Sequence, residues 1–167
     1  MGSSTHGSWL GSYEYDKQRR FAQEVKKGAV VYDIGAHVGY YTLLAPVLVG
    51  CTGKVVAFEP LPRNLRYLRH HLALNHITNV TVIEAVASQN GGTAFFDEGP
   101  DSSMGFVSEH GCLEVKAVSL DELYSAGAIP APGFIKMDIE GGEYKALIGA
   151  QNLLSNTHPV ILLQPMA

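Results

Sequence analysis

Short apolar runs that end at polar residues constrain this chain more than any other feature of its sequence. Continuous rather than alternating apolar runs are typical of strands buried on both faces of a parallel sheet. The predicted strands cover residues 29–34, 54–58, 81–83, 133–138 and 159–163. Segments with helical spacing of apolar residues separate them, over 9–27, 38–49, 62–75 and 143–154. Strands that alternate with helices predict an α/β fold with a mostly parallel, doubly wound sheet.

A glycine-rich stretch, residues 90–111, interrupts this rhythm and is predicted to be a loop with a short hairpin. An extended segment follows over 113–118, and we expect the loop to contribute contacts to a substrate. The length of 167 residues leaves room for one domain, over 9–167. Residues 1–8, MGSSTHGS, are predicted to be a disordered tail or a remnant of an expression vector.

The charge of the chain argues against two classes of partner. A net charge of -4 and an isoelectric point near 5.9 give no electrostatic reason to bind nucleic acid or an anionic membrane. The longest apolar stretch, Tyr40–Val49, is interrupted by Thr42 and Pro46 and is too short to span a bilayer. We therefore expect a soluble, cytoplasmic protein that acts on a small molecule.

The end of the first predicted strand carries the sequence Asp33-Ile-Gly35-Ala36-His37-Val-Gly39. Ligands of open α/β sheets bind outside the carboxyl ends of the strands. Gly35 allows a tight turn, and Gly39 lets the next helix begin close to a ligand. A dinucleotide site normally has a third glycine against the pyrophosphate, so this wider loop favours a ligand without phosphates. The carboxylate of Asp33 is placed to hold a cationic amino group, as in S-adenosylmethionine, although such a turn can also bind nothing.

The next strand ends at Glu59-Pro60, twenty residues after Gly39. A carboxylate at about this distance from the glycine turn is placed to accept hydrogen bonds from ribose hydroxyls. The third strand ends near Glu84-Ala85, which we expect to form a wall for the adenine. An ordinary exposed acid at a strand end is the alternative for Glu59, and contacts through the backbone are as well supported as side-chain contacts at Glu84-Ala85.

Several segments of the sequence, in this order, resemble the FkbM family of methyltransferases over nearly the whole chain. They are Trp9–Glu14, Val31–Leu43, Ala57–Pro60, Leu74–Asn75, Ser119–Asp121, Ile135–Glu143 and Leu147–Ala150. The resemblance implies a Rossmann-like class I methyltransferase fold and S-adenosylmethionine as methyl donor. It also implies transfer to an oxygen, usually a hydroxyl of a sugar, polyketide or other natural product, and it does not name the acceptor.

The chain departs from the family pattern in two places. His37 stands where the family usually has Asn, and it is bulkier and titratable. Gln164 stands where an acid is expected, and the sequence then stops at Ala167 without the final β-hairpin that closes methyltransferase sheets. An unpaired sheet edge favours association, so a homo-oligomer is one expectation.

Asp138, at the end of the fourth core strand, is the predicted general base, with Glu140 beside it as a second catalytic carboxylate. Methyl transfer needs little more than positioning and removal of the hydroxyl proton. Asp138, Glu140 and Glu143 could instead hold a hard divalent cation. We favour base catalysis and predict no metal, because an acid such as Glu143 in the first turn of a helix is stabilised without any function. Lys136 is expected only to neutralise this cluster.

Two other classes of protein remain as alternatives. A nicotinamide-dependent oxidoreductase would share the fold and Glu59, but it needs a phosphate-binding glycine loop that this sequence lacks. A catalytically silent domain that keeps the sheet, and binds the cofactor or a partner, is the stronger alternative.

Overall fold

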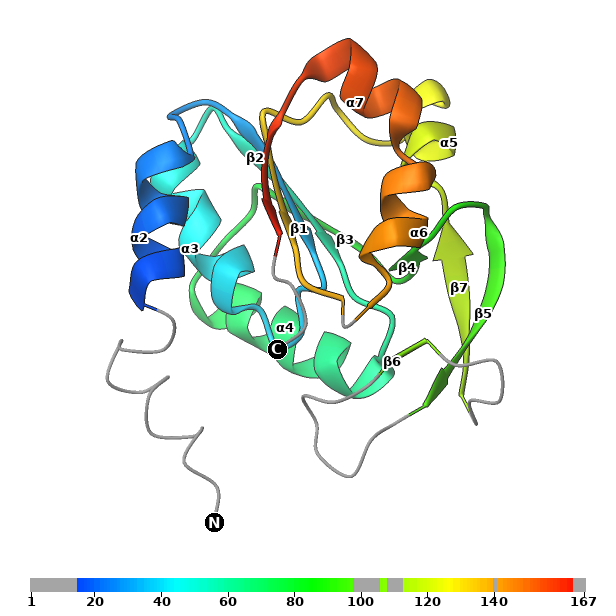
Figure 1. The fold of residues 1–167 in the computed structure, drawn as a ribbon. Coiled ribbons are helices and arrows are strands. Elements are labelled where there is room, and N and C mark those ends of the chain that lie inside the picture. Colours follow the sequence, from blue (N-terminus) through cyan, green and yellow to red (C-terminus); the bar gives the residue numbers. More distant parts are fainter. Residues whose placement is uncertain (1–14, 98–105, 108–112, 140, 164–167) are drawn as a thin grey trace.

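A parallel sheet of five strands forms the centre of the protein (Figure 1). The structure is a computed structural model that describes residues 15–97, 106–107, 113–139 and 141–163. The strands lie in the order β3 (Val80–Ile83), β2 (Lys54–Phe58), β1 (Val30–Ile34), β8 (Phe134–Met137) and β9 (Val160–Leu163). Every pairing among them is parallel, as the continuous apolar runs predicted.

Helices cover both faces of this sheet, so the predicted doubly wound architecture is confirmed (Figure 1). One face packs against α2 (Tyr15–Glu24), α3 (Tyr40–Val49) and α4 (Pro62–Leu74), and the other against α5 (Leu120–Ser125), α6 (Glu143–Ile148) and α7 (Gln151–Thr157). Successive residues of a strand point to opposite faces. Thus Val31 packs with Phe21 of α2, whereas Tyr32 packs with the α5–α7 side.

A second, smaller sheet lies beside the first. Its order is β4 (Val86–Ala87), β7 (Leu113–Val118), β5 (Gly92–Asp97) and β6 (Phe106–Val107). The short hairpin predicted within 90–111 is present, since β5 and β6 pair antiparallel, but residues 92–96 also pair antiparallel with β7, so this part of the segment is sheet rather than loop. The segment favours a strand after its first glycine because Thr93, Phe95 and Phe96 are β-branched or aromatic. Residues 98–105 and 108–112 of the predicted loop lie outside the described residues.

The predicted helix over 143–154 is two helices, α6 and α7, that break at Gly149. A Cβ atom at Gly149 would lie 2.1 Å from the carbonyl oxygen of Ser88, so the chain passes too close to that loop for any other residue. The Asp121 carboxylate then starts α7 by accepting hydrogen bonds from the backbone N–H groups of Asn152 (3.0 Å) and Leu153 (2.7 Å).

The order of the strands reverses at β1, with β2 and β3 on one side of it and β8 and β9 on the other. Open α/β sheets bind ligands in the crevice where this reversal occurs, at the carboxyl ends of the strands. In this protein the carboxyl ends of β1 and β8 are adjacent, with Ile34 paired to Met137. The loops that begin there are the glycine loop, residues 35–39, and the turn that starts at Asp138.

Candidate active site

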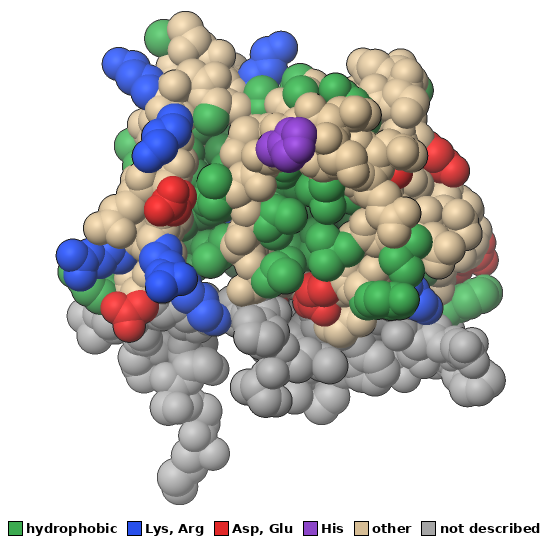
Figure 2. All heavy atoms as spheres, turned by 45° about the horizontal axis from the view of Figure 1, so that its top comes forward, with side chains coloured by type: hydrophobic (Ala, Val, Ile, Leu, Met, Phe, Trp, Pro, Cys, Tyr) green, Lys and Arg blue, Asp and Glu red, His purple; other side chains and the backbone are tan. Residues whose placement is uncertain are grey.

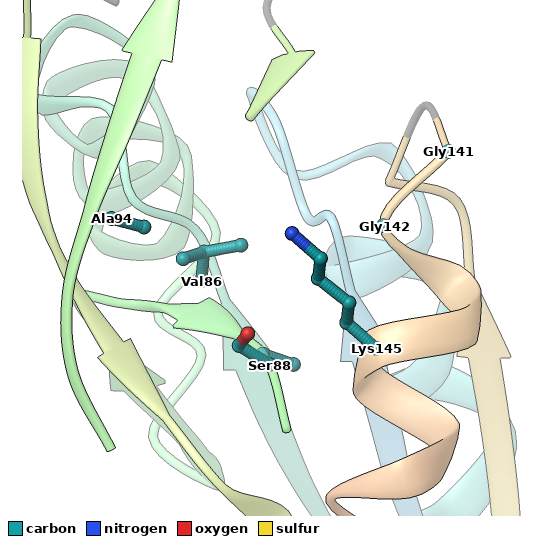
Figure 3. A pocket seen from close by; sticks show the side chains of 7 residues that line it. Val86, Ser88, Ala94, Gly141, Gly142 and Lys145 are labelled. Carbon is teal, nitrogen blue, oxygen red and sulfur yellow. The ribbon is translucent and has the colours of Figure 1, made fainter. Parts of the chain in front are cut away.

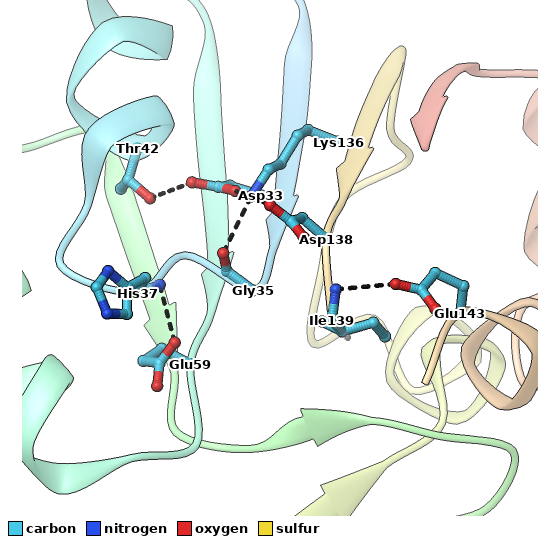
Figure 4. Close-up of polar contacts among 9 residues, drawn as sticks. All are labelled: Asp33, Gly35, His37, Thr42, Glu59, Lys136, Asp138, Ile139 and Glu143. Carbon is cyan, nitrogen blue, oxygen red and sulfur yellow. Dashed lines mark hydrogen bonds and ion pairs between the residues drawn. The ribbon is translucent and has the colours of Figure 1, made fainter. Parts of the chain in front are cut away.

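The glycine loop is held between the ends of β2 and β8 (Figure 4). The backbone N–H groups of Gly35 and Ala36 both donate to the carbonyl of Phe58, at 3.0 Å. Gly35 has a φ of +83°, and a Cβ atom there would lie 1.9 Å from the carbonyl oxygen of Asp138. Only glycine fits this contact, so the predicted cofactor loop and the predicted catalytic turn touch through their backbones. Gly39, with a φ of +102°, turns the chain into α3, which therefore begins at Tyr40 and not at the predicted Val38.

Glu59 follows β2 and is almost completely buried, with 4% of its surface exposed. Its Oε2 accepts a hydrogen bond from the backbone N–H of His37 at 2.8 Å, and its Oε1 accepts from the Leu61 N–H and the Asn64 side chain, each at 3.0 Å. A carboxylate has about four lone-pair sites, so one site on Oε2 remains among the described contacts. Glu59 thus holds the glycine loop in place, and one of its acceptor positions is not used by a described residue.

Asp33 does not present its carboxylate to a ligand cavity in this structure. The residue is fully buried, and its Oδ2 accepts a hydrogen bond from the Thr42 hydroxyl at 2.6 Å. The ammonium of Lys136 lies 3.2 Å from its Oδ1, which forms an ion pair there but no hydrogen bond with a described residue. The structure therefore brings Asp33 to the predicted site, but as an interior partner of Lys136.

Lys136 connects the two central strands at the site (Figure 4). Besides the ion pair with Asp33, its ammonium donates to the carbonyl of Gly35 at 3.0 Å and lies 4.0 Å from Oδ2 of Asp138. The ring of Tyr41 in α3 covers it, with 5.2 Å between the ammonium nitrogen and the ring centroid. Lys136 was expected only to neutralise the cluster of Asp138, Glu140 and Glu143, but its closer ion pair is with Asp33, and of that cluster only Asp138 is within 4.0 Å among the described contacts.

Asp138 is the accessible member of this group, with 26% of its side chain exposed. Its backbone N–H donates to the carbonyl of Ile34 at 3.0 Å, which continues the pairing of β1 and β8 by one residue. Glu143 accepts a hydrogen bond from the Ile139 N–H at 3.1 Å and so closes the turn into α6. Glu140 lies outside the described residues. Within the described residues, no group of three or more His, Cys, Asp or Glu side chains is arranged to hold a metal.

A small pocket of about 90 Å³ lies between the second sheet and the start of α6 (Figure 3). Val86, Ala87, Ser88 and Ala94 form one side, and Gly141, Gly142 and Lys145 form the other. Val86, which lines this pocket, directly follows Glu84-Ala85, the predicted adenine wall, in the sequence.

The predicted adenine-wall residues and Pro60 have different environments. Ala85 is fully buried, Pro60 is partly exposed, and Glu84 is exposed and paired with Arg69 on the surface. Of the two residues predicted to form the adenine wall, only Ala85 is therefore buried, and the Glu84 side chain lies at the surface.

Sequence reasoning gave no site role to Thr42 or Asn64 and only a minor one to Lys136. A signal was available in each case, because polar residues in otherwise apolar elements need partners when they are buried. Thr42 and Asn64 are buried in α3 and α4, and Lys136 is buried in β8, directly paired with Asp33 of β1. Their partners could not be named without the register of the strands.

A family model and several known proteins are similar to this chain. The model of the methyltransferase FkbM domain matches residues 33–164, from the glycine loop through β9. The chain belongs to the FkbM methyltransferase family. S-adenosylmethionine is the methyl donor of these enzymes, as the resemblance implied.

One curated relative is the hexuronic acid methyltransferase AglP of Haloferax volcanii, which is 29% identical over 153 residues. The match covers 89% of this chain, and the chain spans 61% of the length of that relative. Two solved structures are also similar. The FkbM methyltransferase of Methylobacillus flagellatus is 25% identical with a TM-score of 0.61, over 81% of this chain and 32% of that chain. A SAM-dependent methyltransferase of Aquifex aeolicus is 16% identical with a TM-score of 0.51, over 89% and 62%. The Rossmann-like methyltransferase fold is thereby confirmed.

Proposed function

We propose that this chain binds S-adenosylmethionine at the carboxyl ends of β1 and β2 and transfers its methyl group to a hydroxyl oxygen of a small, sugar-like acceptor. One observation carries this proposal. The glycine loop and the turn at Asp138 meet at the point where the strand order reverses, with no room between Gly35 and the Asp138 carbonyl for a side chain. A donor on the loop and an acceptor beside Asp138 would therefore be neighbours.

The residues at this edge fit the cofactor. Glu59 keeps one acceptor position on Oε2, which suits a ribose hydroxyl. Gly39, the residue at the start of α3, has no side chain of its own to cap the helix, and the positive end of this helix dipole suits a carboxylate. The backbone at Ala85 and the pocket at Val86–Ser88 suit the adenine. When bound, the cofactor supplies a methyl group on a positively charged sulfur.

Asp33 has a different proposed role from the one that its position in the sequence suggested. Because its carboxylate is buried against Thr42 and Lys136, we assign it to holding Lys136 rather than to direct contact with the amino group of the cofactor. The cofactor contacts of the loop then fall to the backbone of residues 35–39 and to Glu59.

Asp138 is the proposed general base. Its side chain is partly exposed at the sheet edge, whereas Asp33 and Glu59 are buried and Glu143 is engaged with the Ile139 N–H. The acceptor oxygen forms a bond to the methyl carbon as the carbon–sulfur bond breaks, and the hydroxyl proton passes to the Asp138 carboxylate. The rest of the rate comes from holding the reacting atoms in line.

The chemical class of the acceptor is suggested by one relative. AglP is named for a hexuronic acid, a sugar that carries both hydroxyl groups and a carboxylate. We therefore propose a uronic acid or a glycoside of one as the first acceptor to test. Transfer to a hydroxyl would give a methyl ether that withstands mild alkali, whereas transfer to the carboxylate would give an ester that does not.

Calorimetric titration with S-adenosylmethionine, its demethylated product and NAD tests the cofactor site. Saturable binding of the first two and none of NAD is expected. Glu59→Gln is expected to weaken that binding at least about tenfold, because an amide cannot accept all three hydrogen bonds that Glu59 accepts. Glu114→Gln, an exposed change in β7, is the matched control. No binding to the parent chain would contradict the proposal.

Turnover with uronic acid acceptors tests the catalytic assignment. Asp138→Asn keeps the size of the side chain and removes its basicity, so kcat is expected to fall about 10²–10⁴-fold while cofactor affinity is retained. Cofactor binding without turnover in the parent chain would favour the silent domain instead. An alkali-labile product would overturn the choice of a hydroxyl as the acceptor group.

A further inference from the structure

Lys136 is a nearly buried cation in the middle of the proposed site. Its side chain is 7% exposed, and that of its closest carboxylate, Asp33, is 1% exposed. A charge at this depth is costly to keep unless it is paired and hydrogen-bonded. The pairing is built into the sheet, because Asp33 and Lys136 are directly opposite in the register of β1 and β8 and point to the same face.

The ammonium is fixed from its interior side. Asp33 Oδ1 lies 3.2 Å away, the Gly35 carbonyl accepts a hydrogen bond at 3.0 Å, and the centroid of the Tyr41 ring lies 5.2 Å from the ammonium nitrogen. Asp33 is itself fixed by the Thr42 hydroxyl at 2.6 Å. These contacts leave Lys136 little freedom to move.

Asp138 approaches the same ammonium from the accessible edge of the sheet, with 4.0 Å between its Oδ2 and the ammonium nitrogen (Figure 4). At this distance the attraction between the two charges orients the Asp138 carboxylate, but the two groups do not form a tight, buried ion pair. Lys136 therefore links the glycine loop, through the Gly35 carbonyl, to the carboxylate of the catalytic turn.

We propose that Lys136 is a positioning residue for methyl transfer, which holds the Asp138 carboxylate in the orientation that receives the proton of the acceptor hydroxyl. This inference rests on the proposed function, since it takes Asp138 as the general base. It adds a residue that touches neither acceptor nor methyl group. Its effect is on kcat rather than on cofactor affinity, because backbone hydrogen bonds from Gly35 and Ala36 to Phe58 hold the glycine loop without Lys136.

A purely structural role, in which Lys136 only neutralises Asp33, makes a different prediction. Lys136→Met leaves the Asp33 charge buried without its cation, so either role predicts a loss of stability. The double variant Asp33→Asn with Lys136→Met removes both interior charges and keeps an oxygen for the Thr42 hydroxyl. The double variant therefore leaves no buried charge without a partner, which is all that a structural role requires. It does not restore a cation beside Asp138.

The test compares the parent chain, Lys136→Met, the double variant and Lys116→Met, an exposed lysine of β7 that serves as control. Melting temperature, cofactor affinity and kcat with the acceptor are measured for each. We expect the melting temperature to fall in Lys136→Met and to recover in the double variant, while kcat stays about 100-fold low in both. Cofactor affinity is expected to stay within about threefold of the parent value. Recovery of kcat together with melting temperature would overturn the proposal.

A second readout does not depend on turnover. Crystal structures of the parent chain and the double variant are expected to show one Asp138 side-chain orientation in the first and a displaced or divided one in the second. An unchanged Asp138 orientation would overturn the inference even if the parent chain had no activity. Absence of turnover in the parent chain would count against the proposed function alone.

Discussion

His37 adopts a left-handed backbone conformation in the middle of the glycine loop, with a φ of +52°. Side chains without a Cβ branch, and Asn above all, tolerate this region best, and His is also enriched there. This preference gives a physical reason for both the Asn that is usual in the family and the His of this chain. In this backbone conformation the His37 N–H donates its hydrogen bond to Glu59.

Substitutions at His37 should therefore follow backbone preference rather than side-chain chemistry. His37→Asn is expected to change the free energy of unfolding by less than about 0.5 kcal/mol, whereas His37→Val is expected to lower it by about 1–2 kcal/mol. His70→Val, on the exposed face of α4, controls for the introduction of a β-branched residue. Urea denaturation measures all three, and equal losses in His37→Asn and His37→Val would contradict the backbone explanation.

For individual residues of the site, the sequence predicted their positions but not which residues contact one another. The positions of Gly35, Gly39 and Glu59 at this edge of the sheet could be predicted, because Gly35 and Glu59 directly follow buried strands and Gly39 directly precedes α3. The role of Asp33 as an interior partner of Lys136 could not be predicted. It depends on the strand register that places Lys136 beside Asp33, and on Thr42, which lies one helix turn into α3. A buried carboxylate and an exposed one look alike in a strand-end motif.

At the scale of elements, Ser119–Asp121 and the segment around Gly149 fasten the α5–α7 layer together. The Ser119 hydroxyl and the Asp121 N–H both donate to the Gly149 carbonyl, at 2.9 and 2.8 Å. The Asp121 carboxylate caps α7, while the Ser119 oxygen accepts from the Glu122 N–H at the start of α5. Both segments contributed to the family resemblance, and their contacts are structural.

Asp121→Ala is accordingly expected to lower the free energy of unfolding by about 1–2 kcal/mol, since two N–H groups at the start of α7 lose their acceptor. Cofactor affinity, measured by calorimetry, should be unchanged because α7 lies away from the glycine loop. Asp16→Ala in the first turn of α2 is the matched control and is expected to cost less than about 0.5 kcal/mol. A loss at Asp121 no larger than at Asp16 would show that the cap does not stabilise α7.

The strands of the central sheet could be predicted from sequence within one or two residues, because burial on both faces leaves a continuous apolar run. The smaller sheet could be predicted only in part: the extended segment over 113–118 is β7 and the short hairpin is β5 with β6, but the pairing of β5 with β7 joins separate segments and was not predicted. The break between α6 and α7 was hidden for a similar reason. Helical spacing of apolar residues continues through Gly149, and only the approach of Ser88 shows why the helix stops.

For the whole molecule, the surface agrees with an acidic protein of mixed charge. Figure 2 shows Lys and Arg side chains along the side where α2 lies, together with Asp and Glu, and hydrophobic side chains across the middle of that face. Val160 and Leu163 of β9, the outer strand of the described sheet, are 45% and 43% exposed. No helix in the described part of the chain has the length and hydrophobicity to span a bilayer.

Stability at alkaline pH should depend on one buried phenol. Tyr32 of β1 is fully buried, and its hydroxyl donates to the Pro130 carbonyl. Burial, with a smaller contribution from Tyr124, raises the pKa of Tyr32 well above its ordinary value, because the interior disfavours the charged phenolate. A pKa raised in the folded state means that the neutral form stabilises the fold below the unfolded pKa of about 10. That contribution is lost as pH rises further toward the folded pKa.

We therefore expect the free energy of unfolding of the parent chain to decrease above about pH 10. Tyr32→Phe removes the titrating group, so it is expected to lose about 1 kcal/mol near neutral pH, for the missing hydrogen bond, but to show a shallower decrease above about pH 10. Urea denaturation of both proteins from about pH 8 to about pH 11 measures this difference. All other residues are the same in the two proteins, so the comparison isolates the contribution of Tyr32. Parallel curves would mean that the phenolate of Tyr32 is accommodated in the folded protein.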